Sequence, residues 1–297
     1  MNIILLQDIF SFSSEGGGSN VVVSGLAANF SKSGNKVSVI CSTQDREKEG
    51  EENFESIDIH RIYADYHPRW KSYLGLYNPQ TVKKVKRIIE DIKPDVVNAH
   101  NIHNQLSYHC LKIAKKSGAK VFLTSHDVQL FNHGKFMGKF IIKNENEHRP
   151  RYKTRSIDQL MNFRKRYNPL RNYVIRYYLS YVDKIVAVSS ELKEALHQNG
   201  IKNTMVIHNA IDVSQWKVSG NDTRRFNKTY GLEQKKVILF GGRLSVAKGG
   251  LVILQAINSI QKKVPDVRLV IMGKKEKFMR NKKICEYVNK LRKNIIF

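Results

Sequence analysis

The sequence predicts an α/β protein with two doubly wound, mainly parallel sheets, each in a Rossmann-like lobe of its own. Short apolar, β-branched runs alternate with amphipathic helical patterns along nearly all of the 297 residues. Glycine or polar residues follow the carboxyl ends of most of these runs, where parallel α/β sheets bind their ligands. A chain of this length has room for two such lobes.

We place the first lobe at residues 1–215, where apolar runs of strand length recur. Helical patterns separate them; one has Pro79 at its first position and repeats Val82, Val85 and Ile89 at helical spacing. The predicted strands are residues 2–7, 36–42, 57–63 (toward an edge), 95–99, 120–124, 183–188 and 204–207. The predicted helices end near Ser33 or span residues 79–92, 105–117 and 173–181, and a further one follows a Ser189-Ser190 cap.

A polar segment, residues 216–234, is the predicted linker to a second lobe at residues 235–297. This lobe has predicted strands at 237–240 and 267–272, helices near 248–263 and 277–292, and the opening of another strand at 294–297. So few elements cannot bury both faces of a parallel sheet. We therefore expect an incomplete second lobe with exposed apolar surface, in a chain that is C-terminally truncated.

Composition limits the function classes. The chain contains no apolar run of about 18 residues or more, so no membrane span is expected, and its start is typical of a first strand rather than a signal peptide. Cys41, Cys110 and Cys285 form no CxxC pair. This pattern fits a reducing cytoplasm and makes a zinc site improbable.

The net charge of +25 is unusual, and much of it lies in residues 135–176. Such a field attracts polyanions, which include nucleic acid, an anionic membrane surface and a charged substrate, although a charge run can also be a solvated face. Aromatic residues that would suit stacking on single strands are interleaved: Tyr152, Phe163, Tyr167, Tyr173, Tyr177 and Tyr178.

The segment VILFGGRLSVAKGG, residues 237–250, is the most informative in the chain. A strand that ends at Gly241 and Gly242 lets a ligand approach the backbone closely. A helix beginning near Lys248 directs its free N–H groups toward that ligand. Arg243 and Lys248 supply two cations there, which predicts a diphosphate site.

Polar strand ends in the first lobe complete the candidate site. Glycines 16, 17 and 18 follow the first strand, but Val21 replaces the third glycine of GxGxxG, and the second strand ends without a carboxylate for a nicotinamide ribose. Both observations argue against a dinucleotide oxidoreductase. The residues that follow two later strands are His100, Asn101 and His103, and His126 with Asp127.

The ordered motifs EGGGSN, NAHNIH, LTSHD, IVAVSSELKE, VIHNAID, FGGRLSVAKGG and LVIMGKKE resemble those of the family 4 glycosyltransferases, retaining enzymes of the GT-B fold. The resemblance implies transfer of a hexosyl or other glycosyl group from a nucleotide-diphosphate sugar to a polysaccharide or lipid-linked acceptor. With such an acceptor, the basic stretch at residues 135–176 would lie against an anionic membrane surface. We therefore expect a cytoplasmic enzyme of cell-envelope polysaccharide synthesis, peripheral on the inner face of the cell membrane.

The resemblance also implies roles for individual residues. Arg243 and Lys248 would stabilise the leaving diphosphate, and His126 would lie near the reacting bond. Gly16, Gly17, Gly18, Gly242 and Gly273 would line the donor phosphate and nucleotide. His100, Asn101 and His103 would line the acceptor side, and Asp127 would orient His126 or bind a hydroxyl.

The resemblance implies no metal and no other cofactor, since protein cations neutralise the diphosphate. No carboxylate pair suited to double displacement is evident, which is compatible with front-face attack. The family's later glutamate pair has no counterpart before Phe297, so we expect little activity from this chain alone. The alternatives are a basic nucleic-acid-binding protein without a recognised reading motif, and a sugar-nucleotide epimerase on the same fold.

Overall fold

The computed structural model describes residues 1–12, 17–134, 150–213, 217–242, 244–273 and 281–297. The chain divides into two compact units, Met1–Asp212 (unit 1) and Val213–Phe297 (unit 2). Each unit is an α/β domain with its own sheet and its own apolar core.

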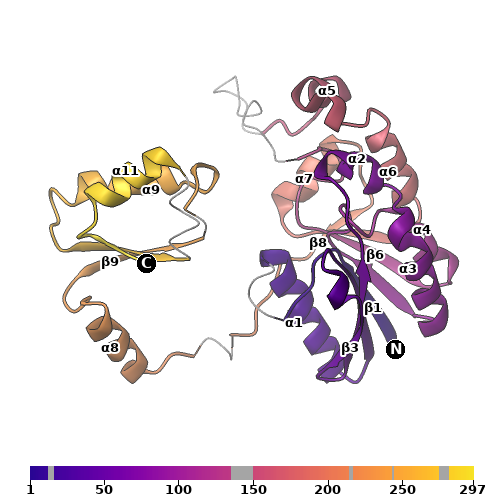
Figure 1. Ribbon diagram of the computed structural model, residues 1–297, viewed down its shortest axis with the longest axis horizontal. Helices are drawn as coiled ribbons and strands as arrows, with labels where there is room; N and C mark the ends of the chain where they lie inside the picture. The colour runs from indigo at the N-terminus through magenta and orange to yellow at the C-terminus, as the bar shows by residue number, and fades with distance from the viewer. Residues whose placement is uncertain (13–16, 135–149, 214–216, 243, 274–280) are drawn as a thin grey trace. The chain divides into compact units, whose positions relative to one another are not determined.

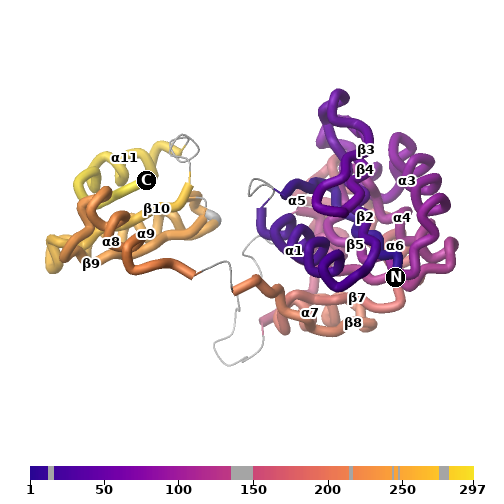
Figure 2. Tube along the Cα trace, turned by 90° about the horizontal axis from the view of Figure 1, so that it is seen from below, coloured from indigo at the N-terminus to yellow at the C-terminus, as the bar shows by residue number. Residues whose placement is uncertain are grey.

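Unit 1 contains an eight-stranded sheet in the order β3-β4-β2-β1-β5-β6-β7-β8. All neighbouring strands pair in parallel except β3 and β4, which are antiparallel. Figure 2 shows β3 and β4 at one end of this sheet and β7 and β8 at the other. The strands are β1 Asn2–Gln7, β2 Lys36–Thr43, β3 Gly50–Phe54, β4 Ile57–Tyr63, β5 Val96–Ala99, β6 Lys120–Ser125, β7 Lys184–Ala187 and β8 Thr204–Val206.

Helices cover both faces of this sheet; Figure 1 shows α1 on one face and α3 and α4 on the other. Strand β1 is therefore buried on both sides. Ile3 and Leu5 pack with α1, whereas Ile4 and Leu6 pack with α3 and α4. The helices are α1 Gly18–Lys32, α2 Lys71–Leu74, α3 Pro79–Ile92, α4 His109–Lys116, α5 Ser156–Phe163, α6 Arg171–Leu179 and α7 Ser190–Gln198, with 3-10 turns η2 Arg46–Lys48, η3 Pro68–Trp70 and η4 Arg164–Arg166.

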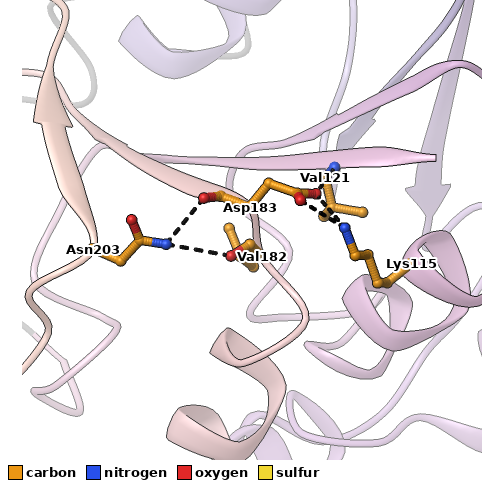
Figure 3. Close-up of polar contacts among 5 residues, drawn as sticks. All are labelled: Lys115, Val121, Val182, Asp183 and Asn203. Atoms are coloured by element: carbon orange, nitrogen blue, oxygen red, sulfur yellow. Dashed lines mark hydrogen bonds and ion pairs between the residues drawn. The ribbon is translucent and has the colours of Figure 1, made fainter. Parts of the chain in front are cut away.

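Asp183 holds the amino-terminal ends of β6 and β7 together (Figure 3). Its carboxylate accepts hydrogen bonds from the Val121 N–H at 2.7 Å and from Lys115 Nζ at 2.6 and 2.7 Å. Asn203 Nδ2 donates to the Asp183 carbonyl at 3.0 Å and so ties in the start of β8. The Lys115 ammonium lowers the pKa of the Asp183 carboxyl.

Unit 2 contains a three-stranded parallel sheet in the order β11-β10-β9. Helices α9 and α11 lie over one face of it (Figure 1), where Leu254, Ile257 and Ile284 pack against β10. The elements are α8 Gly220–Thr229, β9 Lys236–Gly241, η6 Val246–Lys248, α9 Gly250–Ile260, β10 Val267–Met272, α11 Lys282–Lys290 and β11 Ile295–Ile296.

Several predicted boundaries were wrong. The strand expected at residues 57–63, toward an edge, is β4 with the same bounds, but the edge strand itself, the entirely exposed β3, was not predicted. The helix expected from residue 105 begins at His109, and the one expected from Lys248 begins at Gly250, after the 3-10 turn that holds Lys248. The predicted linker contains helix α8.

Candidate active site

The carboxyl ends of β1, β5 and β6 lie side by side in unit 1, because these three strands are neighbours in the sheet. Asp8 follows β1, His100 follows β5 and His126 follows β6. The sheet order thus brings together polar residues that are more than ninety positions apart in the chain.

His100 and His126 form a hydrogen-bonded pair. His100 Nδ1 lies 2.9 Å from His126 Nε2, and the rings stack with centroids 5.2 Å apart and planes 23° apart. Burial lowers the pKa of His100 to about 3 and that of His126 to about 4, so both rings are neutral at physiological pH. In a neutral pair one ring donates and the other accepts, which couples their tautomers.

The outer nitrogens of the pair differ in their surroundings. His100 Nε2 is buried and has no hydrogen-bond partner within the described ranges. His126 Nδ1 likewise has no hydrogen-bond partner among the described residues, but unlike His100 Nε2 it is not fully buried. A group that binds His126 Nδ1 would therefore select the tautomer of both rings.

In the described contacts Asp127 forms no hydrogen bond to His126, so the first of its two predicted roles, orienting His126, is not seen, and the second, binding a hydroxyl, stays a prediction. Its Oδ1 accepts a hydrogen bond from the Gln129 N–H at 2.8 Å, and its carbonyl accepts one from Ser125 Oγ at 2.9 Å. The residue that contacts His126 is His100. Asp127 thus closes the turn after β6, and burial raises the pKa of its carboxyl.

The glycine loop and Asn101, both predicted from the sequence, meet at Ser19. Asn101 Nδ2 donates to Ser19 Oγ at 2.9 Å, and the Asn101 N–H donates to Gln7 Oε1 at 3.2 Å. Gly17, at φ 80°, is the N-cap of α1 and has no side chain to cap it. Its carbonyl accepts the N–H groups of Asn20 and Val21, so an anion could bind the preceding N–H groups of Gly18 and Ser19. Gly18 is the first residue of α1, and Gly16 lies outside the described residues.

Asp8 is a site residue that the sequence reasoning missed. Its carboxylate accepts the N–H groups of Asn104, Gln105 and Leu106 at 2.7, 3.0 and 2.8 Å. Burial nevertheless raises its pKa to about 6, because desolvation of the charge outweighs these bonds. Asp8 fixes the loop after β5, which carries His100, Asn101 and His103.

Two cations near this loop were also missed. Burial lowers the pKa of the Lys71 ammonium, while the charges of Asp8 and Asp127 oppose that shift. Arg171 is buried, donates to the Gln129 carbonyl and forms a 3.0 Å bond to Asn172 Oδ1. Burial holds the pKa of His103 well below its usual range, and Lys71 and Arg171 add to this effect. In the sequence, Arg171 is marked only by its position within the basic stretch, residues 135–176.

The donor-side residues of unit 2 lie around the carboxyl ends of β9 and β10. Gly242 (φ 142°) follows β9, and Gly273 (φ 153°) follows β10. Lys248 is exposed in η6, directly before α9, and no side chain caps α9. Arg243 lies outside the described residues, so its convergence with Lys248 on one anion stays a prediction.

One surface hollow of the described residues lies away from this site. It encloses about 410 Å³ near the exposed strand β3, between Glu47, Glu52 and Arg61. In the part of the chain that the structure describes, no three His, Cys, Asp or Glu side chains cluster as metal ligands would. Over the same residues, no helix has both the length and the apolar character needed to cross a bilayer.

Two family models match the chain. Glycosyltransferase Family 4 matches residues 16–215, and Glycosyl transferases group 1 matches residues 222–297. A putative glycosyltransferase of Bacillus subtilis, YtcC, is 34% identical over 105 residues, which are 33% of this chain and 26% of that protein. An uncharacterized glycosyltransferase of Methanocaldococcus jannaschii is 23% identical over 211 residues, 70% of this chain and 45% of the relative. The matched segments thus span less than half of these relatives.

Solved structures show the same fold. Anabaena HepE in complex with UDP and glucose matches with a TM-score of 0.62 and 15% identity, covering 100% of this chain and 68% of that one. A sucrose-phosphate synthase of Thermosynechococcus elongatus matches with a TM-score of 0.65 and 15% identity, covering 100% and 69%. The predicted α/β, GT-B fold class is confirmed.

Proposed function

This chain belongs to Glycosyltransferase Family 4, and on that premise we propose that it moves a sugar from a nucleotide-diphosphate sugar to a polysaccharide or lipid-linked acceptor with retention of configuration. One observation supports this most directly. In both units, the residues that the family resemblance assigns to the donor or the acceptor follow the carboxyl ends of neighbouring parallel strands, where α/β folds bind ligands.

Unit 2 is the proposed donor site. Lys248 and the uncapped amino terminus of α9 would hold the distal phosphates, together with Arg243. Gly242 and Gly273 would allow the nucleotide to approach the backbone. As the bond between the sugar C1 and the phosphate oxygen breaks, these groups would stabilise the negative charge that develops on the diphosphate. We propose that no metal is needed, because these cations perform that task.

Unit 1 is the proposed acceptor side. His126 would bind a hydroxyl of the transferred sugar through Nδ1. His100 would hold the His126 ring in place through its hydrogen bond to Nε2. In the proposed step, the acceptor hydroxyl oxygen attacks C1 on the face that the diphosphate leaves, and its proton passes to a phosphate oxygen. Asn101 and His103 would line the acceptor side.

We further propose a cytoplasmic protein that docks on the inner face of the cell membrane through its basic stretch. The described part of this stretch exposes bases on both sides of α5, among them Lys153, Arg155 and Lys165. Charges of this kind attract anionic lipid, and salt weakens the attraction. The comparisons favour glycosyl transfer and give no support to the nucleic-acid-binding and epimerase alternatives.

Isothermal titration calorimetry of the 297-residue chain with UDP and UDP-glucose tests the donor site. These probes are chosen because HepE structures contain them. We expect binding that Lys248→Ala weakens by about 10- to 100-fold, as befits the loss of a charge-assisted bond. If neither probe binds, a panel of other nucleotide-diphosphate sugars follows, and failure of the whole panel would refute the proposal. Retention is tested by the anomeric NMR coupling of any transfer product.

A further inference from the structure

Helix α5 has its polarity reversed relative to an ordinary surface helix. Its buried residue is Gln159, only 2% exposed, whereas Ile157, Leu160 and Met161 are 55%, 38% and 64% exposed. These apolar residues are spaced i, i+3 and i+4, so they share one face of the helix. Within the described part of the chain, nothing buries that face, which we call the apolar stripe.

Buried hydrogen bonds fix α5 in this orientation. Gln159 Nε2 donates to the Phe131 carbonyl at 3.1 Å, and Gln159 Oε1 accepts the His133 N–H at 2.7 Å. Phe163, at the end of the helix, packs edge-on against the His133 ring with centroids 5.0 Å apart. Turning the apolar stripe inward would leave these buried polar groups unpaired, which is costly. The outward direction of the stripe is therefore part of the fold.

Cations flank the stripe on both sides in sequence. Asp158 is the sole acidic residue between positions 150 and 166. The exposed basic residues of this segment are Arg151, Lys153, Arg155, Arg164, Lys165 and Arg166. An apolar stripe between clusters of bases is the pattern of a helix that lies in the interface of an anionic bilayer.

The stripe is linked to the acceptor side of the proposed site. Ser72 Oγ in α2 donates to the Arg166 carbonyl in η4 at 2.8 Å, which joins the turn after α5 to the helix that begins at Lys71. Lys71 is close enough to Asp8 and Asp127 for their charges to influence its pKa. Figure 1 shows α5 at the same end of unit 1 as α2 and α6.

We propose that Ile157, Leu160 and Met161 insert into the headgroup region of an anionic lipid bilayer, with the flanking bases on the lipid phosphates. This inference rests on the proposed function, since it explains how a lipid-linked acceptor reaches unit 1 without leaving the membrane. A second copy of this chain is a poorer occupant, because it would set one basic cluster against another. Nucleic acid would engage the bases but not the three aliphatic side chains.

Vesicle co-sedimentation of the 297-residue chain tests the proposal. The vesicles are an equal mixture of phosphatidylglycerol and phosphatidylcholine, at low salt and at about 0.5 M salt, where screening acts within about 4 Å. The test variant is Ile157→Ser/Leu160→Ser/Met161→Ser. The matched control, Ile207→Ser/Ile211→Ser/Val213→Ser, changes residues that are 52%, 61% and 73% exposed elsewhere in the chain. Circular dichroism verifies that both variants are folded.

We expect high salt to weaken but not abolish binding of the wild-type chain and the control, because apolar insertion is not screened. At high salt the test variant should bind at least ~10-fold more weakly than either. Complete release of the wild-type chain by salt, or equal binding of the test variant, would overturn the inference. So would a dimer in light scattering that the test variant converts to monomer. Donor binding by calorimetry without vesicles is independent of these results, and its failure would instead refute the proposed transferase function.

Discussion

The two units differ in how they bury their sheets. In unit 1, β1 is covered on both faces and all its residues after Asn2 are buried. In unit 2, α9 and α11 cover one face, while Val237 and Leu239 of β9 are 47% and 61% exposed. Interior strands of parallel sheets are normally covered on both faces. The strand ends that carry the candidate site in unit 1 are therefore held by packing on both faces of the sheet. Unit 2 exposes apolar surface, as expected from its small number of helices and strands.

The units also differ in their ionisable groups. Unit 1 holds buried histidines, a buried aspartate and a buried arginine around the carboxyl ends of its strands. Unit 2 contains no histidine, since the last one in the sequence is His208, and its Lys248 is exposed.

Acid is expected to have the largest effect, and it should act on unit 1. Because the pKa values of His100, His126 and His133 are lowered to about 3, 4 and 4, the folded state binds fewer protons than the unfolded state as the pH falls below 6.5. Each imidazole then lowers the free energy of unfolding by up to about 1.4 kcal/mol for every pH unit of acidification. Asp8 and Asp127 act in the opposite direction, since burial raises the pKa of both carboxyls and so favours the folded state as they protonate. The imidazoles with a lowered pKa, which also include His103, outnumber these two carboxyls.

Urea titrations at pH 7 and about pH 5, with NMR resonances of each unit as separate probes, measure this effect. We expect the midpoint of unit 1 to fall at the lower pH and that of unit 2 to change much less. Equal shifts in the two units would show that the buried histidines do not control the acid response.

Removing the Asp8 carboxylate should produce the next largest effect. Asp8→Ala leaves the N–H groups of Asn104, Gln105 and Leu106 without their acceptor. At ~1–3 kcal/mol for each unpaired buried group, we expect unit 1 to lose about 3 kcal/mol or more. In unit 2, Asn281 Oδ1 accepts the Ile284 N–H as a single cap among the described residues, so Asn281→Ala should cost about 1 kcal/mol. Urea unfolding of both variants compares the two, and equal losses would contradict the buried role of Asp8.

Lys248→Ala should separate donor binding from stability. We expect nucleotide-diphosphate affinity to fall about 10- to 100-fold, equivalent to about 1.4–2.8 kcal/mol, while both units stay as stable as in the wild type, because Lys248 is exposed. Lys235→Ala is the matched control, since Lys235 pairs with Asp266 before β9 and β10 begin. If calorimetry shows the same loss of affinity for both variants, the net charge of the unit, and not the position of Lys248, governs binding.

The smallest effects concern two ion pairs at the amino-terminal ends of strands. Asp183→Asn should cost unit 1 about 1–2 kcal/mol, because Asp183 binds both Lys115 and the Val121 N–H (Figure 3). Asp266→Asn in unit 2 should leave stability unchanged, because the Asp266 side chain is 61% exposed and its pairing with Lys235 is screened by water. Thermal melts of the two variants test this ranking. A larger loss from Asp266→Asn would reverse it.

Prediction from the sequence succeeded where the signal is local. The β-branched alternation of residues 36–42 and 267–272 located β2 and β10 to within a residue. It failed at β3, because Gly50–Phe54 is polar and exposed and is held by backbone pairing with β4 and ion pairs to it. The orientation of α5 also escaped prediction, because hydrogen bonds from Gln159 override the usual inward direction of apolar residues.

The candidate site shows the same division. His100 and His126 were each predicted from the ends of their strands, but their pairing follows from the adjacency of β5 and β6. Asp8 gave no signal, because one aspartate after a strand is common in loops. Its importance depends on the turn at Asn104–Leu106, which folds back onto it.

The sequence by itself determined the alternation of strands and helices and placed glycine, histidine and lysine after particular strands, since periodicity and chain-stopping residues act over a few positions. Tertiary structure alone decided which strand ends are neighbours, that His100 is the partner of His126, and that α5 presents its apolar stripe to the surroundings. The reason is physical: hydrogen bonds and burial that join residues as far apart as Asp8 and Leu106 depend on the packing of the whole unit and leave no local pattern in the chain.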